Sequence, residues 1–278
     1  MFDSSEQEYD INVLREIVRQ LKIDALKMIH KAGGGHPGGS LSAAELVTAL
    51  FFKVMQLRPE EPKWPGRDRF ILSKGHCCPI LYAALARLGF FDRQHLDTLR
   101  KLGSILQGHP DMKRTPGLDA TTGSLGQGLS VGLGMALMGK LDRASYRVFV
   151  MLGCGELNEG QVWEAAMCAA KYKLSNLTAV VDYNQLQLDG TNDEIMPLEP
   201  LDDKWRSFGW NVLRIDGHDL PAILDAFAQA EAYHEGPTVL IAKTIKGKGV
   251  SFMEDQLNWH GVAPSAEQLE AALRELEA

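Results

Sequence analysis

A cysteine between two glycines follows an apolar run, at a place where parallel-sheet proteins often bind ligands. The stretch reads MLGCGELNEG, in which Gly153 and Gly155 flank Cys154 and the acids Glu156 and Glu159 follow. Glycines let a backbone turn tightly and approach a ligand, and the N-terminus of a following helix favours an anion. The stretch therefore predicts a phosphate site, and a tight turn that binds no ligand is the plain alternative.

An asparagine further along the chain extends this prediction to a metal ion. Asn184, in DYNQLQLDG, comes directly after the next apolar run. Because neighbouring parallel strands end at one edge of a sheet, Cys154 and Asn184 are expected to lie within reach of one ion. Magnesium takes about six hard oxygens, usually from protein groups together with a substrate diphosphate. A dinucleotide-binding loop fits less well, because Asn158 stands where the third glycine of that fingerprint belongs.

Four histidines stand next to glycine in segments that we expect to be loops. They are His36 in GGGHPGG, His76 in SKGH, His109 in QGHPD and His260 in NWHG. Any one of them alone is more simply a surface or core histidine. Together they predict a cluster over one cleft, where imidazoles bind hydroxyls and phosphates and move protons near neutral pH. Their spacing does not match the HExxH pattern of a zinc site.

Two further segments have the composition of ligand-binding loops. TTGSLGQG, at 121–128, is rich in glycine and would let the backbone approach a flat ring or a phosphate, although loop flexibility alone would explain it. KTIKGKG, at 243–249, places basic charge just past an apolar run, and a solvated loop is the alternative.

The apolar runs that must position these residues alternate between strand and helix patterns. We expect strands at 69–72, 146–152, 177–183, 211–215 and 238–242, and helices at 11–31, 42–55, 79–88, 161–172 and 220–233. We expect irregular chain at 57–68, 103–130 and 245–263. This order predicts an α/β fold with a doubly wound parallel sheet, helices on both faces and ligands at the carboxyl ends of the strands. We expect residues 1–278 to form one domain.

Composition narrows the classes of partner. The chain has 278 residues, 45% of them hydrophobic, and a formal net charge of −7, which argues against nucleic acid or an anionic membrane as the main partner. The acidic N-terminus does not resemble a signal peptide, and no apolar run reaches about 18 residues, so we expect no membrane span. The cysteines form no CxxC pair and indicate free thiols in the cytoplasm; they are Cys77, Cys78, Cys154 and Cys168.

With these segments in this order, the chain resembles the N-terminal half of transketolase, in the form divided between two polypeptides. The thiamine diphosphate motif of that family is Gly-Asp-Gly followed later by Asn, and Gly153, Gly155 and Asn184 match it. Cys154 stands where the motif has aspartate. SKGH, GHPD, TTGSLGQG, ELNEGQVWEA and the NWHG after KGKG also match, so the resemblance covers nearly the whole chain.

The resemblance implies a role for each of these residues. Asn184 and the backbone carbonyl of Leu186 would bind Mg²⁺, or Ca²⁺ or Mn²⁺, with Cys154 at the position of the motif aspartate. Gly123, Ser124 and Leu125 would support the aminopyrimidine end of thiamine diphosphate, and the remaining cofactor contacts would be Gly39, His76, Gly153, Gly155, Glu156, Lys246 and His260. The histidines that act on the substrate would be His36, His76, His109 and His260. Glu159 and Glu164 match acids at the subunit contact.

The resemblance also implies an activity and a partner. In this family the thiazolium ring of the cofactor carries the chemistry, and a two-carbon ketol unit passes from a ketose phosphate to an aldose phosphate. The glutamate that protonates the aminopyrimidine ring lies in the other half, so we expect activity only with a pyrimidine-domain subunit, in an α2β2 assembly. The second hypothesis is a non-catalytic or weakly cofactor-binding subunit, because Cys154 replaces the aspartate. A cofactor titration separates the two.

Overall fold

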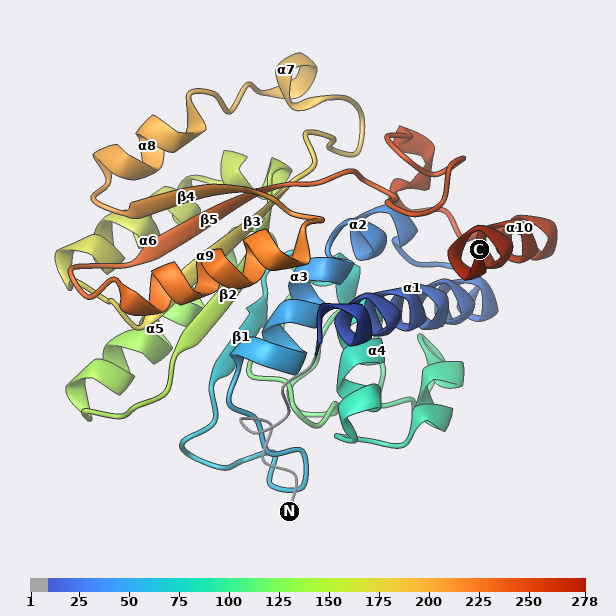
Figure 1. Cartoon of the computed structure of the whole chain (residues 1–278), viewed down its shortest axis with the longest axis horizontal. Helices are drawn as coiled ribbons and strands as arrows, with labels where there is room; N and C mark the ends of the chain where they lie inside the picture. The colour runs from blue at the N-terminus through green and yellow to red at the C-terminus, as the bar shows by residue number, and fades with distance from the viewer. Residues whose placement is uncertain (1–9) are drawn as a thin grey trace.

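The computed structural model describes residues 10–278, and a five-stranded parallel sheet lies at its centre (Figure 1). The strand order is β1-β2-β3-β5-β4, and every neighbouring pair is parallel. The strands are β1 (Arg69–Leu72), β2 (Val148–Gly153), β3 (Leu177–Tyr183), β4 (Asn211–Asp216) and β5 (Thr238–Lys243). The predicted parallel sheet is confirmed, and each predicted strand is present within two residues of its expected bounds.

Helices cover both faces of this sheet (Figure 1). Their bounds are α1 (Ile11–Ala32), α2 (Pro37–Ser42), α3 (Ala44–Ala49), α4 (Cys78–Leu88), α5 (Gln127–Leu141), α6 (Gly160–Lys171), α7 (Asn192–Ile195), α8 (Leu201–Ser207), α9 (Leu220–Ala232) and α10 (Ala266–Glu277). Buried side chains of α1, α3, α4 and α9 form one core cluster, and those of α5, α6 and α8 form a second.

Strand β2 shows how the sheet divides the core in two. Phe149 and Met151 belong to the first cluster, whereas Val148, Val150 and Leu152 belong to the second. Successive strand residues point to opposite faces, so an apolar run without alternation is required where both faces are covered. The runs VFVML and LTAVVDY have this composition for that reason.

Helix α5 contradicts the prediction, which was irregular chain over 103–130 and no helix directly after it. The segment QGLSVGLGMALMGKL contains four glycines, which disfavour helix. Three of these glycines allow close packing. A Cβ atom on Gly128 would overlap Ser73. A Cβ atom on Gly132 would overlap Val150, and one on Gly139 would lie 2.8 Å from the Tyr146 ring. The low helix propensity therefore reflects tight contact of α5 with β2 and with the chain next to β1 and β2.

Other helices differ from the expectation too, and the short helices α7 and α8 were not predicted. α10 was not predicted, although Ser265 and Gln268 form a capping box at its start. The helix expected at 42–55 starts earlier, at Pro37, and is divided into α2, α3 and a π-helical turn at Leu50–Val54. Pro37 at the first helical position suits a helix start, because its missing N–H would have no partner there.

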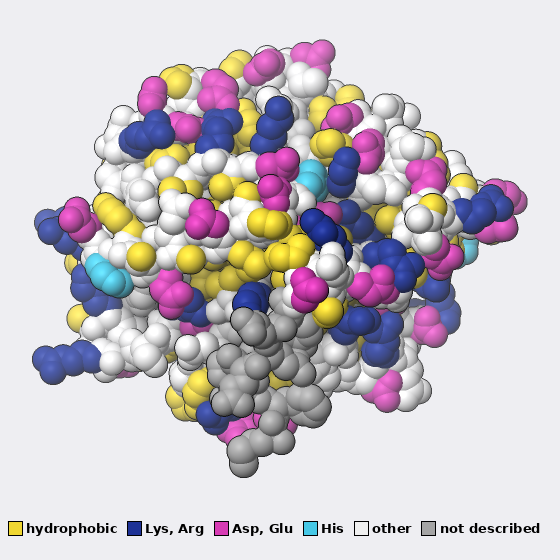
Figure 2. All heavy atoms as spheres, in the orientation of Figure 1, with side chains coloured by type: hydrophobic (Ala, Val, Ile, Leu, Met, Phe, Trp, Pro, Cys, Tyr) yellow, Lys and Arg dark blue, Asp and Glu magenta, His cyan; other side chains and the backbone are white. Residues whose placement is uncertain are grey.

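The charge on the surface, the absence of a membrane span and the free cysteines were also predicted from the sequence. Lys and Arg side chains lie among Asp and Glu over the face seen in Figure 2, without a continuous basic area among the described residues there. Within residues 10–278, no helix combines the length and apolarity needed to span a bilayer. The expectation that the N-terminus is no signal peptide falls on residues 1–9, outside the described part of the chain. All four cysteines are free thiols.

Candidate active site

A cavity of about 300 Å³ lies at the carboxyl edge of the sheet. Strands β2 and β3 are neighbours, with Gly153 opposite Asp182, so the residues after them reach the same edge. Most residues that the sequence assigned to the site line this cavity, and these are His36, Gly39, His76, Gly123, Leu125, Gly153, Cys154, Gly155, Glu156, Asn184, Leu186, Lys246 and His260. Ser124 is exposed and does not line it.

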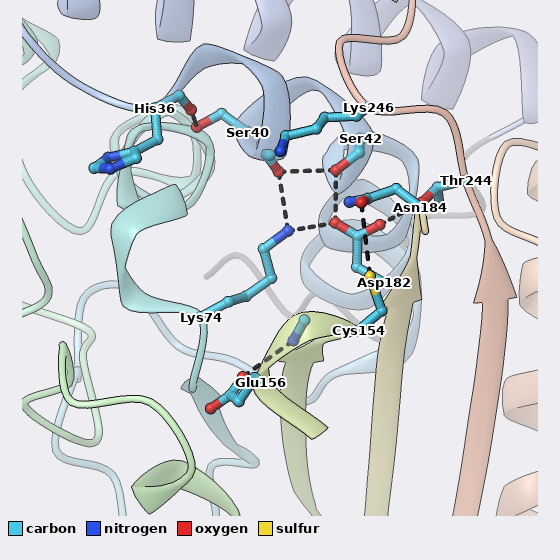
Figure 3. Close-up of polar contacts among 12 residues, drawn as sticks. His36, Ser40, Ser42, Lys74, Cys154, Glu156, Asp182, Asn184, Thr244 and Lys246 are labelled. Atoms are coloured by element: carbon cyan, nitrogen blue, oxygen red, sulfur yellow. Dashed lines mark hydrogen bonds and ion pairs between the residues drawn. The ribbon is translucent and has the colours of Figure 1, made fainter. Parts of the chain in front are cut away.

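The turn after β2 brings Cys154 and Asn184 together, as predicted (Figure 3). The Cys154 thiol lies 3.7 Å from Asn184 Oδ1, which also accepts a hydrogen bond from the Leu186 amide at 3.1 Å. Burial raises the pKa of Cys154, so the thiol is neutral at neutral pH. The pair therefore offers one amide oxygen and an uncharged sulfur.

This donor set fits a hard cation only in part. The side-chain oxygen of Asn184 and the carbonyl of Leu186 suit Mg²⁺ or Ca²⁺, and diphosphate oxygens and water would supply the other ligands. Cys154 does not fit, because a neutral thiol gives magnesium no charge and little affinity. Within residues 10–278, no three His, Cys, Asp or Glu side chains are grouped so as to hold a metal.

Glu156 lines the cavity but is held by the protein itself. Its carboxylate accepts hydrogen bonds from the amides of Gly153, at 3.0 Å, and Gly126, at 2.9 Å, and from the Ser73 hydroxyl. Burial raises its pKa, and these donors oppose that shift. Glu156 therefore joins the end of β2 to the loop after β1 and to the start of α5.

The ammonium group of Lys246 lies in the cavity, close to two backbone carbonyl groups. Its ammonium donates to the Gln187 carbonyl at 2.8 Å, and the Leu186 carbonyl is 3.5 Å away. It also lies 2.9 Å from Nδ1 of His260. Burial and the charge of Lys74 lower the pKa of Lys246 to about 8. At neutral pH this group is a buried cation next to the predicted metal position, which suits an anionic ligand.

Three of the four predicted histidines meet in one cluster. The ring centroids of His36 and His76 are 5.0 Å apart, and that of His260 lies 5.5 Å and 5.4 Å from them. Burial, assisted by nearby positive charge, lowers the pKa of His36 and of His260 to about 4, and that of His76 falls well below its usual value. All three rings are therefore neutral near pH 7 and can donate or accept hydrogen bonds.

The fourth histidine lies beside this cluster. His109 makes no ring contact with the three others in the described structure, and it does not line the cavity. A Cβ atom on Gly123 would lie 3.4 Å from its ring, so His109 packs against the glycine loop that does line the cavity.

Nδ1 of His36 is buried without a hydrogen-bond partner in the described residues, which leaves it available to a ligand.

A buried ion pair that was not predicted lies at the cavity, and its Lys74 is one of the lining residues (Figure 3). Lys74, after β1, pairs with Asp182, near the end of β3, and both side chains are almost fully buried. Asp182 also accepts hydrogen bonds from Ser42, at 2.6 Å, and from Thr244. One signal was available, because an aspartate in the apolar run LTAVVDY and a lysine in SKGH are opposite charges at the ends of β3 and β1, which lie on either side of β2.

The two acids assigned to a subunit contact lie on the surface. Glu159 is the N-cap of α6 and Glu164 is on that helix, and both are exposed. Apolar side chains of α5 and α6 are exposed as well, among them Val131, Met138 and Met167. The contact itself stays a prediction.

The fold and this cavity define a class of protein, an α/β domain that binds a diphosphate cofactor at the carboxyl edge of a parallel sheet. Within that class, residues 13–277 match the family model described as transketolase, thiamine diphosphate binding domain. The chain therefore belongs to the transketolase family, as the sequence indicated, and is a thiamine diphosphate-dependent transferase subunit of that type.

The chain is similar to relatives of about its own length and to longer transketolases. The SqwG subunit of 6-deoxy-6-sulfo-D-fructose transketolase from Clostridium sp. (strain MSTE9) is 48% identical, with 98% of each chain covered. One subunit of the apulose-4-phosphate transketolase from Phocaeicola vulgatus is 47% identical, over 90% of this chain and 89% of that one. The transketolase structure from Campylobacter jejuni superposes with a TM-score of 0.92 at 30% identity, and this chain spans 43% of its length.

Proposed function

We propose that this chain binds thiamine diphosphate in the carboxyl-edge cavity and, with a partner subunit, transfers a ketol unit from an anionic ketose to an aldose phosphate. The observation that carries the proposal is the meeting of Asn184, Leu186 and Lys246 in one cavity with the histidine cluster, whose His260 lies 2.9 Å from the Lys246 ammonium. The two subunit-sized relatives are named for a sulfonated ketose and for a sugar phosphate. Both names point to a substrate with an anionic group, and a sugar phosphate is our first choice.

The residues have separate tasks in this proposal. Asn184 and Leu186 hold the metal, and Lys246 binds the diphosphate as a cation. His260 accepts from Lys246 through Nδ1, so its Nε2 carries the proton and donates toward the ligand. The bound cofactor supplies the carbon nucleophile that adds to the ketose carbonyl.

The histidines act on the sugar. His36 and His76 are neutral and face His260 across the cluster, so they can bind substrate hydroxyls and accept or return a proton. We expect His109, whose ring packs against Gly123, to reach the sugar from beside the cavity. Gly123, Ser124 and Leu125 support the aminopyrimidine end, and Gly39, Gly153, Gly155 and Glu156 shape the wall near the diphosphate.

Assembly completes the proposal. Helices α5 and α6 pack together and carry exposed apolar side chains, and α6 also carries Glu159 and Glu164, so a second subunit would cover this surface. We propose an α2β2 complex with a pyrimidine-domain chain, in which residues 1–278 contribute one domain. The free thiols suit a cytoplasmic enzyme.

Lys246→Ala is expected to weaken thiamine diphosphate binding, because it removes a charge-assisted contact of about 1.5–3 kcal/mol. His260→Ala is expected to lower turnover, since the substrate loses a hydrogen-bond donor. Calorimetric titration of the reconstituted complex measures the first effect and steady-state kinetics the second. The matched control is Lys248→Ala on the same loop, where the lysine pairs with Glu254 instead. Equal cofactor affinity in the two lysine variants would remove Lys246 from the site.

Cys154→Asp is expected to tighten magnesium-dependent cofactor binding by about tenfold or more, near 1.4 kcal/mol. The aspartate restores an anionic oxygen next to Asn184, which magnesium prefers to sulfur. Thiamine diphosphate is titrated into both proteins at fixed magnesium concentration. Cys154→Ser separates charge from the loss of sulfur, and little change is expected for it. Equal or weaker binding by the aspartate variant would mean that residue 154 does not face the metal.

Cys154 also favours the second candidate function, a subunit that binds cofactor weakly and has lost catalysis. The neighbouring glycines, Asn184 and the ELNEG segment are all in place, which supports retained binding. Cofactor titration together with a ketol-transfer assay of the reconstituted complex decides between the two, because the second kind of subunit would bind thiamine diphosphate weakly and show no turnover.

A further inference from the structure

Three consecutive residues after β5 are each held by a different polar group. Thr244 donates its hydroxyl to Asp182. The next amide, that of Ile245, donates to Nε2 of His218 at 2.8 Å. Lys246 then points its ammonium into the cavity. The second of these contacts is made by His218, which does not line the cavity.

The Ile245 contact fixes the protonation of His218. A backbone amide can only donate, so Nε2 of His218 carries no proton. In the neutral ring the proton is therefore on Nδ1, which lies 3.1 Å from Oε2 of Glu45 and donates to it. The imidazole is thus held in one tautomer between a carboxylate and the amide that precedes Lys246.

The carboxylate is itself fixed from a third element. Lys22 of α1 donates to Oε1 of Glu45 at 2.7 Å, with only 6% and 10% of the two side chains exposed. Burial acts to raise the pKa of Glu45, but the Lys22 charge and the His218 hydrogen bond outweigh it and lower that pKa. Glu45 therefore stays a carboxylate and keeps accepting from His218.

This chain of contacts reaches the cofactor cavity through the backbone. It runs from α1 through α3 to the loop after β4, and ends on the residue directly before Lys246. On the other side of Lys246, Gly247 and Gly249 have φ of +83° and +98°, which glycine adopts easily. Without the His218 contact, the start of this loop would keep the Thr244 hydroxyl as its remaining side-chain anchor.

We propose that Lys22, Glu45 and His218 form a positioning relay that sets the place of the Lys246 ammonium in the cofactor cavity. The three are positioning residues, because none lines the cavity and their effect passes through Ile245. The inference rests on the proposed role of Lys246 as a cofactor contact.

The test compares two replacements of His218 in the complex reconstituted with the partner subunit. His218→Phe keeps a ring of similar size without an acceptor, whereas the amide of His218→Gln can accept from Ile245 and donate to Glu45. We expect the Phe variant to bind thiamine diphosphate about tenfold more weakly and the Gln variant to stay within about threefold of the unchanged protein. Amide hydrogen exchange at Ile245 is expected to speed up in the Phe variant alone.

A matched control separates positioning from general destabilisation. Trp210→Phe removes the hydrogen bond from Nε1 to the Ala166 carbonyl, 2.9 Å long, at the opposite end of β4. We expect it to lower stability while cofactor affinity and Ile245 exchange stay unchanged.

Four results would overturn the inference. They are cofactor affinity in His218→Phe equal to that of the unchanged protein, equal weakening in the Phe and Gln variants, unchanged Ile245 exchange, and equal weakening in Trp210→Phe. Lys246→Ala distinguishes the two levels of the argument. If that variant binds cofactor normally, the proposed site role of Lys246 is also wrong. If it binds weakly while His218→Phe does not, the relay alone is wrong.

Discussion

Replacement of Asp182 by alanine is expected to lower the free energy of unfolding by about 3–5 kcal/mol, because it leaves the Lys74 ammonium buried without a counter-charge. Asp182 is fully buried, and Lys74 is 2% exposed. Burial alone would raise the pKa of Asp182, but Lys74 and the hydroxyls of Ser42 and Thr244 hold it below its usual value. In the alanine variant, the Gly39 carbonyl, 3.2 Å from Lys74 Nζ, would remain as an acceptor without charge.

Denaturant unfolding of the full chain measures this effect, with two comparisons. Asp182→Ala combined with Lys74→Met removes both charges and is expected to recover much of the loss, since the uncompensated ammonium is gone. Glu270→Ala removes the exposed partner of Arg274 and is expected to change stability by less than about 0.5 kcal/mol. A loss for Asp182→Ala no larger than that for Glu270→Ala would contradict this account of the ion pair.

The main features of the site could be predicted because they depend on order along the chain. Two apolar runs of strand length, separated by a helix, are normally parallel neighbours. Whatever follows them must then meet at one edge, and Cys154 and Asn184 do so. The same reasoning predicted a cluster of four histidines. Three of them meet in the structure, and the fourth, His109, lies beside them.

The contacts that hold the site in place could not be predicted in this way. Lys74 and Asp182 are separated by 108 positions, and Glu45 and His218 by 173. No spacing rule connects such pairs, because their meeting depends on how helices pack over the sheet. Helix α5 was missed for a related reason, since its glycines reflect close contact with residues far away in the sequence or outside the helix, such as Ser73 and Val150, rather than local preference.

The purified chain alone is expected to show no ketol transfer, and activity is expected to appear when the partner subunit is added. Among residues 10–278, Glu156 is the one carboxylate that lines the cavity. It is occupied by Ser73 and by the amides of Gly126 and Gly153, so it is not free to protonate the aminopyrimidine ring. We therefore expect a second chain to supply the acid for that step.

The central claim is that this chain is the diphosphate-binding half of a two-chain transketolase. The most direct test is a titration of the partner pyrimidine-domain subunit into a fixed amount of this chain, with thiamine diphosphate and magnesium in excess. Ketol transfer between a ketose phosphate and an aldose phosphate is followed by product formation. The account predicts no turnover without partner and a rise that saturates at equal amounts of the two chains. Turnover by the pure chain alone, at the rate of the mixture, would contradict it.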